Sequence, residues 1–219
     1  MTTHLPTIQP RLRWLMAFAW IISSTLASRL AWSEIRTVQG WAEALSHMPQ
    51  TMDSETWVLV DVDYTIMEPS HPALHRSFLY DGHPLTSEQE QCFTGSRTVL
   101  DFVRMMQHPM RLVEECVPAS ISEIRQRGGL IMGFTYLETS VVPPVGESCS
   151  WRAADLHRLG VELSHEPLAR GASRVELTSL SPHRGTYPLF HAGVLYCNGT
   201  HPKGPVLESF CQHIGHRPR

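Results

Sequence analysis

The stretch that decides the fold is "TWVLVDVDYTIMEP", which runs from Thr56 to Pro69. Its valine-rich beginning, "WVLV", is typical of a strand that is covered on both faces of a parallel sheet. Asp61 and Asp63 follow directly, although the whole chain contains few aspartates. A polar group left unpaired beside apolar residues costs about 2–7 kcal/mol. The two carboxylates therefore need a metal ion, a hydrogen-bond network or open solvent.

The composition is that of one globular domain. A chain of 219 residues with 42% hydrophobic residues suits a single domain with room for an inserted subdomain. The net charge of −3 offers no basic surface for a phosphate backbone, so nucleic acid is excluded as a partner. Lys203 is the only lysine, and arginine supplies every other positive charge.

Residues 1–33 have the features of a secretory signal peptide. Arg11 and Arg13 precede an apolar run that is shorter than the roughly 20 residues of a membrane-spanning helix. Small residues between positions 27 and 33 offer cleavage sites. We expect an exported protein, periplasmic or secreted, without a stable membrane anchor after cleavage; an uncleaved anchor is the alternative. Export makes five cysteines potential disulfide partners, with the pairing open: Cys92, Cys116, Cys149, Cys197 and Cys211.

The rest of the chain alternates between strand-like and helix-like segments. Continuous apolar runs predict strands at 57–62, 130–134 and 190–196. Helical spacing and helix-end signals predict helices at 35–45, 118–127, 150–159 and 205–213. Residues 165–188 read as a loop. Strands separated by helices predict an α/β fold, a Rossmann-like parallel sheet with helices on both faces.

Polar residues follow the predicted strands where such sheets bind ligands, at the carboxyl ends. Asp61 and Asp63 lie on one side of an extended segment, and two carboxylates can hold Mg²⁺ together with a phosphate group. Thr135 ends the second predicted strand, and Lys203 begins the last predicted helix. A hydroxyl and an ammonium group are suited to the oxygens of a phosphoryl group.

These motifs resemble those of the haloacid dehalogenase (HAD) superfamily of phosphohydrolases. The first motif appears as "VLVDVDYT", the second as "LIMGFT" ending in Thr135, and the third as "HPKGPVLESF" with Lys203. Within this superfamily the chain more closely resembles a poorly characterised secreted bacterial branch with a domain of unknown function, in which a late "GVLY" segment precedes the lysine. The resemblance covers the chain from Trp57 to the C-terminus.

The resemblance implies a fold, a mechanism and a cofactor. Residues 34–219 would form a HAD-like domain, and a mainly helical cap insertion would occupy about 68–117. Asp61 would attack phosphorus, and Asp63 would protonate the leaving oxygen and then activate water. Thr135 would bind the phosphoryl oxygens, and Lys203 would neutralise their charge. Mg²⁺ would bridge Asp61 and the phosphate of a small phosphorylated molecule, and would also bind the backbone carbonyl of Asp63.

The chain departs from the superfamily after the lysine helix. The fourth motif, an acidic pair on a further strand, has no counterpart after Lys203, so we expect the C-terminal strand and acidic motif to be absent. The phosphohydrolase is then impaired, or Glu68 or Glu138 replaces the missing metal ligand. A non-catalytic exported binding protein that self-associates through an open sheet edge is an alternative. A metal-dependent glycosyltransferase that uses the Asp61–Asp63 pair is a second.

Overall fold

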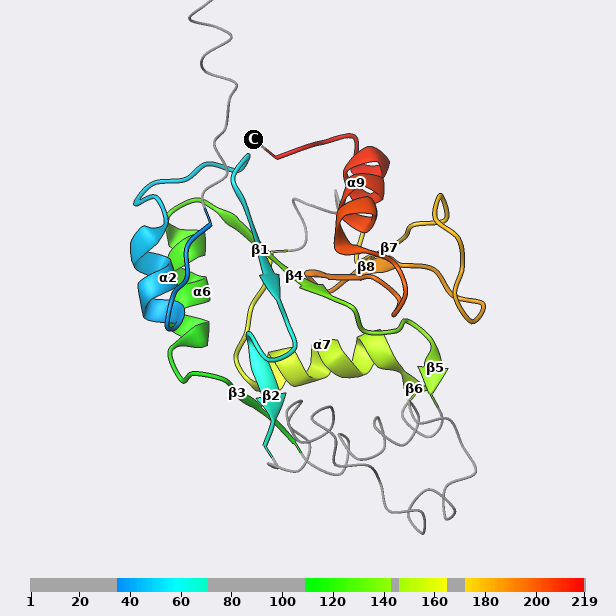
Figure 1. Ribbon diagram of the computed structural model, residues 1–219, viewed down its shortest axis with the longest axis horizontal. Helices are drawn as coiled ribbons and strands as arrows, with labels where there is room; N and C mark the ends of the chain where they lie inside the picture. Colours follow the sequence, from blue (N-terminus) through cyan, green and yellow to red (C-terminus); the bar gives the residue numbers. More distant parts are fainter. Residues whose placement is uncertain (1–34, 71–108, 143–145, 165–171, 219) are drawn as a thin grey trace, which may run out of the picture. The chain divides into compact units, whose positions relative to one another are not determined.

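The computed structural model describes residues 35–70, 109–142, 146–164 and 172–218 (Figure 1). Four helices are α2 (Trp41–His47), α6 (Val117–Gln126), α7 (Ser148–Arg158) and α9 (Lys203–Ile214). One sheet contains β1 (Trp57–Asp61), β4 (Leu130–Thr135), β7 (Arg174–Glu176), β8 (Leu189–His191) and β9 (Val194–Tyr196). Two short pairs are β2 (Met67–Pro69) with β3 (Met110–Leu112), and β5 (Val141–Val142) with β6 (Gly146–Glu147). The fold is therefore mixed α/β, and no helix in the described part is long and apolar enough to cross a membrane.

The sheet is mixed, with the strand order β1-β4-β9-β8-β7. β1, β4 and β9 run parallel, in the register Trp57↔Leu130 and Gly133↔Val194, whereas β8 pairs antiparallel with both of its neighbours, β9 and β7. The prediction of a parallel sheet is thus correct for the pairing of β1, β4 and β9 and wrong for β8, which runs opposite to the other four strands.

The difference arises from one turn that the sequence analysis missed. Residues 190–196 were expected to form one strand, but Ala192 and Gly193 have φ angles of 49° and 79°. Two successive positive φ angles make the tight turn of a β-hairpin, so the segment folds into β8 and β9. β7 lies within residues 165–188, which were expected to be loop, and pairs with the outer edge of β8.

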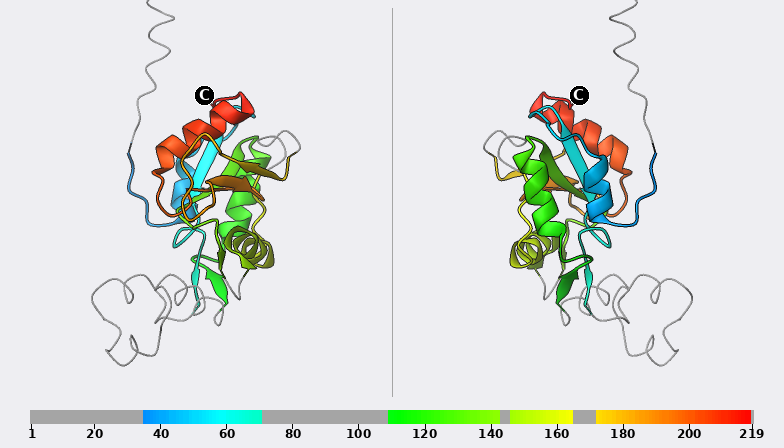
Figure 2. Two further views of the ribbon diagram at one scale, coloured as in Figure 1. Left: turned by 90° about the vertical axis from the view of Figure 1, so that its right-hand side faces the viewer. Right: turned by 90° about the vertical axis from the view of Figure 1, so that its left-hand side faces the viewer.

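Helices cover both faces of the sheet, as predicted. On one face, Ile121 and Ile124 of α6 and Leu156 of α7 belong to a buried cluster with residues of β1 and β4. On the other face, Phe210 of α9 stacks on Phe190 with a centroid distance of 4.9 Å. Figure 2 shows α9 on the side of the sheet opposite to α6 and α7.

The predicted helices are present, and the first is shorter than expected. It begins at Trp41, because the backbone of Gly40 is extended and the Trp41 N–H donates to the Glu114 carboxylate instead of continuing a helix. The predicted signal peptide and residues 71–108 of the predicted cap lie outside the described residues. The described strands β2 and β3 bring Pro69 and Met110 side by side at the two ends of that segment.

Candidate functional site

Asp61 is the last residue of β1, and its side chain meets the only lysine of the chain. The Lys203 Nζ atom lies 2.9 Å from Asp61 Oδ1, which also accepts a hydrogen bond from the Val62 N–H. Lys203 is the first residue of α9, which follows the loop after β9. Asp61 is 48% exposed and Lys203 is 27% exposed, so solvent and ligands reach this pair. The structure thus joins the first and third predicted motifs.

The loop after β1 holds Asp63 in place. The N–H groups of Ile66 and Met67 both donate to the Val62 carbonyl, and Tyr64 has a φ of 62°, which gives the loop a tight turn. The Trp41 Nε1–H donates to the Thr65 carbonyl at 2.8 Å and so anchors the turn to α2. These bonds fix the backbone of the loop that carries Asp63.

Each carboxylate oxygen of Asp63 has a polar partner: one accepts a hydrogen bond and the other forms an ion pair. The Thr135 hydroxyl at the end of β4 donates to Oδ2 at 2.6 Å, and the Nη2 atom of Arg152 lies 2.8 Å from Oδ1. Thr135 is 1% exposed, so its hydroxyl is directed at Asp63 within the protein. All four predicted residues therefore gather at the carboxyl ends of the parallel strands, in two pairs, Asp61 with Lys203 and Asp63 with Thr135.

Arg152 is a site residue that the sequence analysis missed. It is 1% exposed and lies over the Trp151 ring at 4.8 Å, and its Nε has no hydrogen-bond partner among the described residues. A signal was present, because Arg152 falls at helical spacing between Cys149 and Leu156, on the face that α7 buries. A charged residue on a buried helical face needs a counterion, and Asp63 is that counterion.

Residues at the end of β9 support the site without acting as nucleophiles. The Tyr196 hydroxyl donates to the Cys149 carbonyl at 3.1 Å, and burial raises the pKa of Tyr196. Burial raises the pKa of the Cys197 thiol to about 12, with a smaller opposing effect from Lys203. Cys197 therefore stays a thiol at neutral pH. Asn198 is buried, and its side chain bonds Thr139 and Thr186, which fixes the loop that leads to Lys203.

The comparison with protein families places most of the chain in one family. The model of a family described as "Protein of unknown function (DUF2608)" matches residues 37–219. The chain belongs to the DUF2608 family. Neither a curated protein nor a solved structure matches the chain. Every site residue named above lies within residues 37–219, the range that the family model matches.

The described residues supply fewer metal ligands than a closed magnesium site needs. No group of three histidine, cysteine, aspartate or glutamate side chains among them could hold a metal ion. The two proposed substitutes have other partners: Glu68 pairs with Arg111 at 2.6 Å, and Glu138 pairs with Arg184 at 2.9 Å. Both oxygens of Asp63 are bonded, and Asp61 Oδ1 faces Lys203. Of these two carboxylates the described contacts therefore leave Asp61 Oδ2, so most of an octahedral oxygen shell around Mg²⁺ would have to come from water, phosphate and backbone carbonyls.

Four of the five cysteines lie in the described part of the DUF2608 protein, and all four are free thiols: Cys116, Cys149, Cys197 and Cys211. The structure therefore contains no disulfide within these described residues, although the predicted export made disulfides possible. Cys92 lies outside the described residues.

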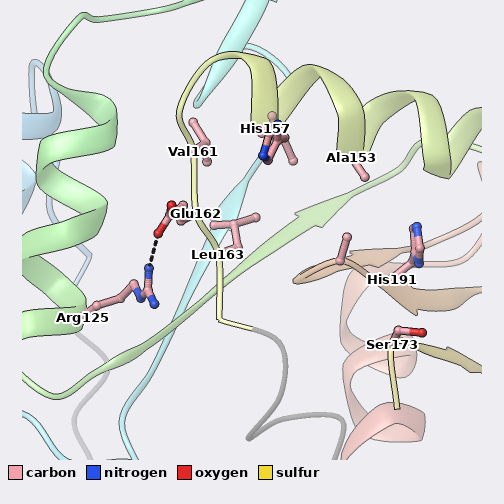
Figure 3. A pocket seen from close by; sticks show the side chains of 10 residues that line it. Arg125, Ala153, His157, Val161, Glu162, Leu163, Ser173 and His191 are labelled. Atoms are coloured by element: carbon pink, nitrogen blue, oxygen red, sulfur yellow. Dashed lines mark hydrogen bonds and ion pairs between the residues drawn. The ribbon is translucent and has the colours of Figure 1, made fainter. Parts of the chain in front are cut away.

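A cavity of about 420 Å³ lies on the face of the sheet that α6 and α7 cover (Figure 3). Its lining includes His157 of α7, His191 of β8, and the ion pair between Arg125 and Glu162 at 3.1 Å. None of the predicted site residues lines it. The cavity is therefore separate from the cluster around Asp61.

Proposed function

We propose that this DUF2608 protein is an exported, HAD-like phosphohydrolase that acts on a small phosphomonoester through an aspartyl-phosphate. The observation that carries the proposal is the 2.9 Å contact between Lys203 Nζ and Asp61 Oδ1. The two residues are far apart in the sequence and belong to different motifs. A partly exposed carboxylate beside an ammonium group is suited to attack on phosphorus, because the cation attracts the phosphate.

In the first step Asp61 acts as the nucleophile. Its Oδ2 atom forms a bond to phosphorus, the bond from phosphorus to the leaving oxygen breaks, and that oxygen takes a proton from Asp63. Lys203 stabilises the negative charge on the phosphoryl oxygens as the transition state forms. To donate this proton, Asp63 must first carry one, and it then gives up the contact with Arg152 or Thr135.

In the second step Asp63 acts as the base. It takes a proton from water, the water oxygen bonds to phosphorus, and the Asp61 carboxylate leaves as phosphate is released. The arrangement in the structure suits this step, because Thr135 and Arg152 both donate to Asp63 and orient an accepting carboxylate. A direct contact between Thr135 and the phosphoryl group stays a prediction.

The same geometry argues against the glycosyltransferase alternative. That chemistry requires the carboxylates of the aspartate pair to hold a metal ion that in turn binds a nucleotide diphosphate. The side-chain oxygens of Asp63 are engaged by Thr135 and Arg152 instead. We therefore prefer the phosphohydrolase.

One observation favours a non-catalytic binding protein as a second candidate function. β1 is an edge strand of the sheet, Leu59 in its centre is 37% exposed, and an apolar groove of about 430 Å³ lies beside it. The Thr56 carbonyl bonds β4, and alternation along the strand directs the backbone groups of Leu59 to the open edge. A second copy could pair antiparallel about Leu59, in a two-fold arrangement.

Sedimentation at rising protein concentration tests this second candidate. A dimer that Leu59→Lys abolishes would support it, because a charge on an edge strand blocks pairing. A monomer at every concentration would exclude it.

Turnover of an aryl phosphate by the purified chain tests the proposed function. Asp61→Asn should abolish turnover, and Asp53→Asn, an exposed aspartate whose Oδ1 accepts from Glu55 and Thr56, should not change it. Acid quenching should trap phosphate on the peptide that contains Asp61. Absence of turnover in a folded wild-type protein would contradict the phosphohydrolase.

A further inference from the structure

The charges of the site balance without an added ion. Each of the two carboxylates has its own cation, Lys203 at 2.9 Å from Asp61 and Arg152 at 2.8 Å from Asp63. A site built around a divalent cation normally has an excess of negative charge, because that charge attracts the metal. Among the described residues, the two acidic and two basic side chains sum to zero before any ligand enters.

Lys203 is also held where a bridging metal would be repelled. Its ammonium group lies 5.4 Å from the centre of the Phe134 ring and 5.6 Å from that of Tyr136. These cation–π contacts restrain it beside Asp61. A divalent cation on the same carboxylate would lie within a few ångströms of this fixed positive charge, and like charges at such a distance repel.

Arg152 makes the second carboxylate unavailable to a metal in the same way. The side chain is 1% exposed, so water cannot stabilise its charge if Asp63 turns away to another cation. Binding a metal through the Asp63 carboxylate would therefore leave a buried arginine without its counterion, whereas the backbone carbonyl of Asp63 is not part of this ion pair. The two ion pairs disfavour metal binding through Asp61 Oδ1 and through the Asp63 carboxylate, because each pair would have to break first.

We propose that the site binds the phosphoryl group without a divalent cation, the positive charge being supplied by Lys203 with Arg152 neutralising Asp63. This inference rests on the proposed function, since it concerns how the same site holds its substrate. It differs from the magnesium-dependent mechanism that the sequence resemblance implies, because Lys203 takes the place of the metal.

Calorimetric titration of the full chain with inorganic phosphate tests the proposal. The dissociation constant should agree within about threefold between buffer with EDTA and buffer with Mg²⁺. In EDTA, Lys203→Met should weaken binding by about tenfold or more, and Lys203→Arg should retain most of it, because a charge-assisted hydrogen bond is lost only in the first. Arg125→Met, at an exposed ion pair away from the site, is the matched control and should bind as the wild type does.

Phosphate binding that occurs only with Mg²⁺ would overturn the inference, and turnover with Mg²⁺ would then leave the proposed function intact. Binding in EDTA that Lys203→Met does not weaken would also overturn it, since the cation would not be the one assigned. No phosphate binding in either buffer, together with no turnover, would overturn both the inference and the proposed function. Because Lys203 is partly exposed, its substitution is not expected to unfold the chain, and a circular dichroism spectrum like that of the wild type would verify this.

Discussion

The ion pair between Arg152 and Asp63 predicts an unequal effect of removing either partner. Arg152 is 1% exposed and Asp63 is 30% exposed, with 2.8 Å between Nη2 and Oδ1. Arg152→Met keeps much of the apolar volume and leaves Asp63 with Thr135 and partial access to water. Asp63→Asn instead leaves a positive charge inside the protein without a counterion. The aspartate substitution should therefore be the more destabilising of the two.

The magnitudes follow from the environment of each charge. Arg152→Met should lower the free energy of unfolding by about 1.5–3 kcal/mol, the value of a hydrogen bond to a charged group. Asp63→Asn should lower it by about 3–5 kcal/mol, as for a buried ion pair that loses one member. The double variant should be less destabilised than Asp63→Asn alone, because it no longer contains the buried charge.

Urea unfolding followed by circular dichroism measures all three variants. Arg125→Met, which breaks an exposed ion pair at 3.1 Å with Glu162, serves as the control and should cost less than about 1 kcal/mol. The reasoning would be refuted if Asp63→Asn cost less than Arg152→Met, or if the two effects added within about 0.5 kcal/mol, as they do for sites that do not interact. The same measurement is required before any loss of turnover in Asp63→Asn is ascribed to chemistry.

Three further predictions concern the elements that hold the site. A hydrogen bond from Arg174 lowers the pKa of Glu147 from its ordinary 4.5, so this pair stabilises the fold above that pH and stops doing so as the pH falls. Glu147→Gln should remove this part of the pH dependence of stability. In urea unfolding at neutral pH the loss should be up to about 1 kcal/mol. At neutral pH a thiol reagent should label Cys116, which is partly exposed, and should not label Cys197, because Cys197 is buried and burial raises its pKa to about 12. Peptide mapping identifies the labelled cysteine. Labelling of Cys197 in the native protein would contradict the prediction. Gly133→Val should destabilise the fold by about 1–3 kcal/mol in urea unfolding, because even a Cβ atom there comes within 2.9–3.1 Å of three aliphatic side chains; an unchanged midpoint would show that β4 can shift.

Local patterns in the sequence predicted the elements that local interactions determine. The apolar runs gave β1 and β4, and Pro118 and Gly128 marked the ends of α6 within a residue or two. The hairpin of β8 and β9 was missed because its turn is Ala192–Gly193, and alanine rarely adopts a positive φ. β7 was missed because a strand of three residues leaves almost no periodic signal and depends on its pairing with β8.

The candidate site, like the fold, was predictable where its residues belong to recognisable elements. Asp61, Asp63, Thr135 and Lys203 carry a signal because each stands at the end of a recognisable element, and strand ends meet at one edge of a sheet. The sequence signal for Arg152 was weaker, since only its position on the buried face of α7 distinguishes it from the other arginines. Which cation meets which carboxylate depends on tertiary packing, so the sequence did not predict that Asp63 would be paired with a buried arginine.

The position of α7 therefore governs the chemistry proposed for Asp63. The helix is tied to β9 by the bond from Tyr196 to the Cys149 carbonyl, and to the loop after β4 by the Ser148 hydroxyl, which donates to the Glu138 and Ser140 carbonyls. Arg152 projects from the next turn of the same helix onto the loop after β1. The carboxylate that we propose to give and take a proton is thus oriented by a helix anchored to the two strands that end beside it. A shift of α7 would change the partner of Asp63 while Asp61 and Lys203 stayed in contact, so the proposed nucleophilic attack and the proposed proton transfer would depend on separate parts of the fold.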